Sequence, residues 1–96
     1  MPASRDKSLQ PQLEVFALPT VPGIPGPYRF FFYSFDCNEP RHVHVRRDKA
    51  TCKYWLEPVV LAYNSGFSSK ELNRIRNIIL LSLERMREAW DEHCGQ

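Results

Sequence analysis

The clearest hydrophobic and polar pattern in the chain is the alternation His42-Val43-His44-Val45-Arg46. Successive side chains of a β-strand point to opposite faces of a sheet. The pattern therefore predicts a strand with the two histidines and the guanidinium in a row on one face. The two valines lie on the other face, which we expect to be buried.

Two further segments have the residue types of strands. Residues 28–35 (YRFFFYSF) are rich in aromatic side chains and apolar on both faces. This predicts a strand that is either central or covered by a helix on one side and by the N-terminal arm on the other. Residues 50–57 follow the alternating segment after Asp48-Lys49, which we expect to form a two-residue turn. On one face the turn is expected to pair apolar side chains, Val45 with Cys52 and Val43 with Tyr54. On the other face it is expected to pair the polar row with the third strand, Arg46 with Thr51, His44 with Lys53, and His42 with Trp55.

The rest of the chain has helical signals. Pro58 suits the first turn of a short helix over residues 59–64. Ser68 and Glu71 then form a capping box for one long helix that runs to about His93. Its apolar residues recur at steps of three and four, the period of a buried stripe, and they are Leu72, Ile75, Ile79, Leu83, Met86 and Trp90.

Together these elements predict an α+β fold, with a small three-stranded antiparallel sheet packed on a long C-terminal helix and a short helix before it. The chain has 96 residues, which allow one hydrophobic core. Residues 1–26 hold five of the eight prolines and are expected to form a partly flexible arm. Residues 27–96 are expected to form a single domain.

Composition sets the broad class of the protein. With 43% apolar residues the chain can form a packed globule, and a net charge of +2 neither requires nor excludes a nucleic-acid partner. The cysteines, Cys37, Cys52 and Cys94, have no paired spacing, and the first residues lack the apolar core of a signal peptide. We therefore expect reduced thiols in a cytoplasmic protein. The longest apolar run, at residues 78–81, is too short for a membrane span.

A set of motifs in chain order resembles a known family. They are FFFYS, EPRHVHV, CKYWLEPV, LAYNSGFS and a late EAW, and together they are similar to the small bacterial proteins grouped as domain of unknown function 4160. The resemblance covers about residues 18–95. The sequence departs from the family pattern at Arg41, where a second proline is usual, at Cys52, where a small residue is common, and in the extension before Leu18.

The resemblance implies a prokaryotic protein that is often encoded beside a second small protein. Members of this family are commonly suspected of belonging to toxin–antitoxin modules. We therefore expect a cognate antitoxin or toxin protein as a partner, RNA as a candidate target, and a candidate homodimer through the C-terminal helix. No membrane partner is expected.

The polar row has the residue types of a metal-independent ribonuclease. Such an enzyme needs a base, an acid and a cation that stabilises the charged phosphorane. His42 and His44 could divide the acid and base roles, while Arg46 and Lys53 hold the phosphate. Contacts with the nucleic acid are expected from the remaining cations and the indole near this face, which are Arg29, Arg41 and Trp55. On this hypothesis no metal and no cofactor are needed.

Three other interpretations compete with cleavage. Two histidines at positions i and i+2 of a strand can share a metal ion, with Asp36, Glu39 or a cysteine as third ligand. A histidine-triad hydrolase is disfavoured because Arg46 stands where the third histidine would be. The last interpretation is non-enzymatic: the basic and aromatic face binds a protein or a nucleic acid, as in an antitoxin or a regulatory homodimer.

Overall fold

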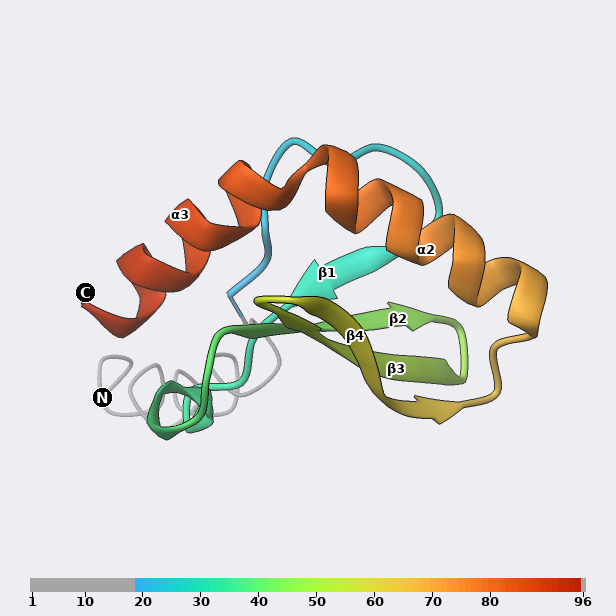
Figure 1. The fold of residues 1–96 in the computed structure, drawn as a ribbon, viewed down its shortest axis with the longest axis horizontal. Helices are drawn as coiled ribbons and strands as arrows, with labels where there is room; N and C mark the ends of the chain where they lie inside the picture. Colours follow the sequence, from blue (N-terminus) through green and yellow to red (C-terminus); the bar gives the residue numbers. More distant parts are fainter. Residues whose placement is uncertain (1–18, 96) are drawn as a thin grey trace, which may run out of the picture.

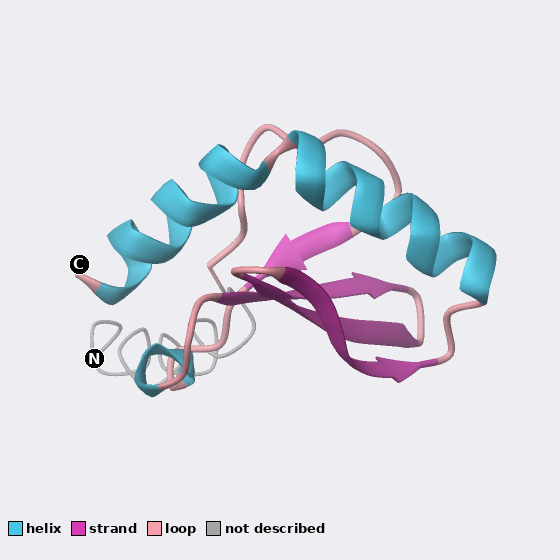
Figure 2. Ribbon diagram, in the orientation of Figure 1, coloured by secondary structure: helices cyan, strands magenta, loops and turns pink. Residues whose placement is uncertain are grey.

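The computed structural model describes residues 19–95 and shows a twisted antiparallel sheet with two helices on one of its faces (Figures 1 and 2). The strands lie in the order β1-β2-β3-β4. In chain order the elements are β1 (Arg29–Phe31), the 3-10 turn η1 (Asp36–Asn38), β2 (His42–Arg47), β3 (Ala50–Leu56), β4 (Val59–Ser65), α2 (Ser69–Leu81) and α3 (Leu83–Cys94). The fold is therefore α+β, as predicted, but the predicted sheet lacked one strand.

The central hairpin is confirmed residue by residue. Strands β2 and β3 are antiparallel, with Val45 opposite Cys52, His44 opposite Lys53 and His42 opposite Trp55. The chain reverses at Asp48-Lys49, where Asp48 adopts a positive φ of 56°. Aspartate tolerates this left-handed conformation better than most residues, which explains why an Asp-Lys pair can make the turn.

The expected short helix over residues 59–64 is wrong, because this segment forms strand β4. Strand β4 is antiparallel to β3, and the connection contains a cis peptide bond between Glu57 and Pro58. Proline thus ends one strand and turns the chain into the next one. The β-branched pair Val59-Val60 and Tyr63 are typical strand formers, and they extend the sheet on its outer edge.

The expected single long helix is also wrong in detail, because it is broken into α2 and α3 at Ser82. The amide of Ser82 still donates to the carbonyls of Ile78 and Ile79, at 3.0 and 3.1 Å, but its backbone leaves helical geometry with φ −113° and ψ 20°. The helical axis changes direction at this residue (Figure 1). The predicted start is confirmed, since the Ser68 side chain accepts a hydrogen bond from the amide of Glu71.

Strand β1 lies at the edge of the sheet and not at its centre. It is three residues long and pairs with β2 alone among the named strands. The preceding segment covers its outer side, because the amide of Val21 donates to the carbonyl of Phe30 at 2.8 Å, and the amide of Phe32 donates to that of Pro19 at 2.9 Å. The end of the predicted arm therefore packs on the domain, while residues 1–18 of that arm lie outside the described residues.

The core lies between the sheet and the two helices. Sheet residues Val43, Val45 and Cys52 are buried against helix residues of the predicted stripe, of which the fully buried ones are Ile75, Ile79, Met86 and Trp90. Cys52 is thus a core thiol, and burial raises its pKa to about 12. Within residues 19–95, neither helix has the length and apolar character that a membrane span requires.

Candidate functional site

The helix-free face of the sheet carries aromatic and cationic side chains. Residues paired across antiparallel strands lie on the same face, so the pairings Arg29–Arg46, Phe31–His44, His44–Lys53 and Lys53–Tyr63 define one continuous surface. We call it the open face, and we define it by Arg29, Phe31, His44, Arg46, Thr51, Lys53, Trp55 and Tyr63. Neither α2 nor α3 covers it in the ribbon views, while the short η1 lies on this side and its Asp36 contacts His44.

A pocket lies at the middle of the open face. It has a volume of about 330 Å³, and its walls include Phe31, Tyr33, His44, Lys53 and Tyr63. The His44 ring stacks on Phe31, with centroids 5.5 Å apart, and meets the edge of Tyr33 at 4.6 Å. One predicted catalytic histidine is therefore a pocket wall that aromatic rings hold in place.

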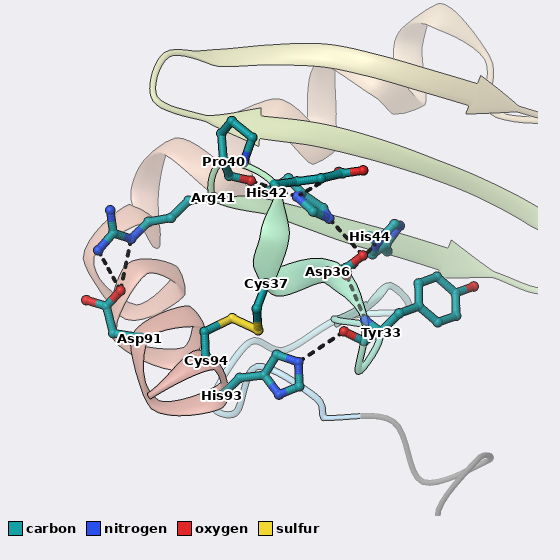
Figure 3. The surroundings of a disulfide bond; sticks show 11 residues. Tyr33, Asp36, Cys37, Pro40, Arg41, His42, His44, Asp91, His93 and Cys94 are labelled. Carbon is teal, nitrogen blue, oxygen red and sulfur yellow. Dashed lines mark hydrogen bonds and ion pairs between the residues drawn. A yellow bond between two sulfur atoms is a disulfide. The ribbon is translucent and has the colours of Figure 1, made fainter. Parts of the chain in front are cut away.

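The two predicted histidines meet at a buried carboxylate. Oδ2 of Asp36 lies 2.9 Å from Nε2 of His44, and Oδ1 lies 3.2 Å from Nε2 of His42. Asp36 is itself fixed by the amide of Tyr33, which donates to Oδ2 at 2.7 Å. Figure 3 shows the three side chains converging between η1 and β2. We call Asp36, His42 and His44 the histidine–aspartate centre.

His42 is fully buried and its orientation is fixed. Nδ1 lies 2.9 Å from the carbonyl of Pro40, which can only accept, so Nδ1 carries the proton. Trp55 and Trp90 lie against the His42 ring at centroid distances of 5.5 and 4.9 Å. His42 therefore has no exposed surface with which to contact a substrate directly.

His44 is half-buried, and its pKa is lowered from the ordinary 6.5 mainly by that burial. The Asp36 carboxylate acts in the opposite direction but does not outweigh the desolvation, to which the charge of Lys53 adds. A neutral imidazole at physiological pH follows from this shift. Such a ring can accept a proton or a metal ion.

The predicted phosphate ligands differ in their surroundings. Nζ of Lys53 lies 2.8 Å from Oε1 of Glu39 and 4.4 Å from the centroid of the Trp55 ring. This ion pair lowers the pKa of Glu39. Arg46 lies on the open face, is exposed, and donates through Nε to the carbonyl of Asp48 at 3.3 Å.

Two predicted nucleic-acid contacts are also placed by the structure. Arg29 lies on the open face, with its guanidinium 5.2 Å from the Phe31 ring centroid. Arg41 instead reaches helix α3, where it donates to Oδ1 of Asp91 from Nη2 at 2.6 Å and from Nε at 3.0 Å. The structure therefore brings Arg29 to the site and ties Arg41 to the C-terminal helix.

The expectation of reduced thiols is wrong for two of the three cysteines. Cys37 and Cys94 form a disulfide that joins η1 to the end of α3 (Figure 3). The two cysteines are 57 residues apart, so no local spacing motif predicts that they pair. Disulfides persist mainly in oxidising compartments, and the cytoplasmic location expected from the sequence stays a prediction. Next to it, Nε2 of His93 lies 3.0 Å from the carbonyl of Tyr33.

Sequence reasoning missed some residues of the site. The sequence predicts a helix at Tyr63 and so does not place it opposite Lys53. Asp36 is one of several candidate third ligands, and nothing in its spacing from His42 and His44 favours it over Glu39. Only the folded η1 shows that the Asp36 carboxylate turns inward.

Comparison with known proteins gives one result. A family model described as a domain of unknown function, DUF4160, matches residues 28–91. No curated protein and no solved structure matches the chain significantly. The matched region begins just before β1, ends near the end of α3 and contains the whole histidine–aspartate centre and open face. The chain therefore belongs to the family of domain of unknown function DUF4160.

Proposed function

We propose that this protein binds single-stranded RNA on the open face of its sheet. The observation that carries the proposal is the pocket between Phe31, Tyr33 and Tyr63, with Lys53 in its wall and Arg46 on the same face. Proteins that bind single strands combine aromatic rings, on which bases stack, with cations that follow the phosphates. A pocket of about 330 Å³ lies at the lower end of the range for small-ligand sites.

The placement of the histidines favours binding over cleavage. A general acid or base must come within hydrogen-bond distance of the proton it moves, and His42 is fully buried with Nδ1 held by Pro40. His44 is more exposed, but its Nε2 is bound to Asp36. The predicted division of acid and base roles needs two histidines that can reach the substrate, and His42 cannot because it is fully buried.

The exposure of Tyr63 also supports a ligand on this face, whereas Phe31 is buried in the pocket wall. Tyr63 has 56% of its surface exposed, on an edge strand where Val60, which pairs with Trp55 of the open face, is exposed as well. Large exposed apolar groups of this kind mark interaction surfaces. A partner protein could use the same edge, which is the non-enzymatic alternative expected from the sequence, and RNA titrations separate the two.

Fluorescence anisotropy with a labelled single-stranded RNA of about 12 nucleotides tests the proposal. Loss of one stacking ring costs about 1–3 kcal/mol, so Tyr63→Ala is expected to weaken binding by about 5- to 150-fold. Arg46→Ala is expected to reduce the slope of log affinity against log salt by about 0.7, the value for one phosphate contact with a single strand.

The controls are matched surface residues on the helices. Arg74→Ala removes an exposed cation of α2, and Leu81→Ala removes an apolar side chain that is 89% exposed. Both are expected to bind like the wild type. The proposal is wrong if the wild type shows no saturable binding at low salt, or if the open-face variants bind as tightly as these controls.

A place in a toxin–antitoxin pair stays a prediction from the family resemblance. We propose the test of inducing the wild type and His44→Ala in a bacterial host without the partner. Growth arrest by the wild type that His44→Ala relieves would support a toxin acting through this face. Unimpaired growth in both cases would leave no support for a toxin and favour the antitoxin or binding-partner alternative.

A further inference from the structure

The histidine–aspartate centre has the donor set of a transition-metal site, and we infer that it binds one Zn²⁺. Two imidazole nitrogens and one carboxylate oxygen, from Asp36, His42 and His44, lie within 4.8 Å of one another. Zinc sites with three protein ligands use nitrogen and oxygen donors at about 2.0–2.2 Å, which places tetrahedral ligands roughly 3.3 Å apart. The carboxylate of Asp36 lies between the two rings, with Oδ1 3.2 Å from Nε2 of His42 and Oδ2 2.9 Å from Nε2 of His44, so each nitrogen is already within ligand spacing of one of its oxygens.

The state of His42 gives the strongest support. Because Nδ1 donates to Pro40, Nε2 of the neutral ring carries a lone pair, and this lone pair is buried. Nε2 is within 3.2 Å of Oδ1 of Asp36, yet it has no hydrogen-bond partner. A buried nitrogen without a hydrogen-bond partner beside a carboxylate is unfavourable. A cation that both groups coordinate removes the conflict.

The groups around the centre resemble those that support metal ligands elsewhere. Metal-bound histidines almost always donate their other ring N–H to a carbonyl or carboxylate, which fixes the tautomer. The bond from Nδ1 of His42 to Pro40 is such a contact, and the amide of Tyr33 holds Oδ2 of Asp36 in the same way. The protein has thus already oriented two of the three donor atoms.

Local charge also favours a divalent cation. Asp36 lies at the centre, and the Glu39 carboxylate approaches His42 to 3.7 Å. Lys53 lies opposite His44 on β3, but Glu39 binds it at 2.8 Å and so offsets its charge. Within residues 19–95, no fourth histidine, cysteine or acidic side chain joins the group. Water is therefore the expected fourth ligand, with access from the pocket side through His44, the most exposed of the three residues.

A second proton on His42 is the competing occupant of this space. It would place an imidazolium against Asp36 and leave no lone pair for a metal. Because metal ions and protons compete for the same nitrogen, direct measurement of zinc decides between them. The test does not depend on RNA, so its result is separate from that of the proposed function.

The experiment uses the full chain, purified without chelators from zinc-supplemented medium, followed by elemental analysis. The stripped protein is then titrated with ZnCl₂ in a calorimeter and melted with and without zinc. About one zinc per chain is expected, with a higher Tm in its presence because the ion binds the folded state. Asp36→Asn and His44→Gln are each expected to weaken zinc binding by at least about tenfold.

Two matched variants serve as controls. Glu84→Gln changes an exposed carboxylate of α3, and His93→Gln changes the histidine beside the disulfide. Both are expected to bind zinc like the wild type, with native circular dichroism spectra confirming the fold. The inference is overturned if the wild type neither retains nor takes up zinc. It is equally overturned if folded His44→Gln binds zinc as tightly as Glu84→Gln, and this variant decides the matter should Asp36→Asn fail to fold.

Discussion

Removal of the Cys37–Cys94 disulfide is expected to destabilise the fold substantially. The bond joins residues 57 positions apart and encloses the chain from η1 to the end of α3. Closing a loop of that length in the unfolded chain costs about 4 kcal/mol by the chain-entropy relation. This value is a large share of the roughly 5–15 kcal/mol by which domains are stable.

The measurement is urea unfolding followed by circular dichroism, with the wild type compared with Cys37→Ser/Cys94→Ser. Serine avoids free thiols that would themselves bind zinc beside His93. The double variant is expected to lose about 4 kcal/mol, less any structure that remains in its unfolded chain. The wild type treated with a reductant should lose a similar amount. A loss below about 1 kcal/mol would refute the view that loop closure in the unfolded chain supplies this stability.

Three further outcomes follow from the core and its surface. Ile79→Ala is expected to lower the free energy of unfolding, measured in urea, by about 2–5 kcal/mol because Ile79 is fully buried. The exposed Leu81→Ala should change it by no more than about 0.5 kcal/mol. Equal losses in the two variants would show that Ile79 does not lie in the core. The hydrogen bonds from Arg47 lower the pKa of Glu71 below 4.5, so their stabilisation is present above pH 4.5 and is lost as the pH falls through the folded-state value. Arg47→Gln should therefore flatten the acid limb of a stability–pH curve, and an unchanged limb would contradict the pairing. Cys52, whose pKa burial raises to about 12, should resist iodoacetamide at pH 8 until urea unfolds the chain; rapid native alkylation would show that the thiol is accessible.

The central hairpin could be predicted because several local signals agree. Alternation over residues 42–46 set the faces, and apolar matching across Asp48-Lys49 set the register. A shift by one residue in either direction would have placed at least one of Val43 and Val45 opposite Lys53. This redundancy is why the order of polar residues on the open face was predicted correctly over β2 and β3.

Other elements depend on contacts that a linear pattern does not contain. Val59 to Asn64 suits either a short helix or a strand, and the pairing with β3 decides for the strand. The break at Ser82 is hidden because the apolar stripe continues across it into α3. The disulfide and the inward carboxylate of Asp36 both depend on η1 folding back toward α3 and β2. No short-range sequence motif predicts this contact.

The most direct test of the central claim is to locate the ligand on the molecule. Amide signals of the ¹⁵N-labelled protein are assigned and followed by NMR while a short single-stranded RNA is added. The account predicts that the largest shifts lie on the open face, at Phe31, His44, Lys53 and Tyr63, while the outer residues of α2 and α3 stay unchanged. Shifts confined to the helices, or no shifts at concentrations that saturate ordinary RNA-binding domains, would contradict it.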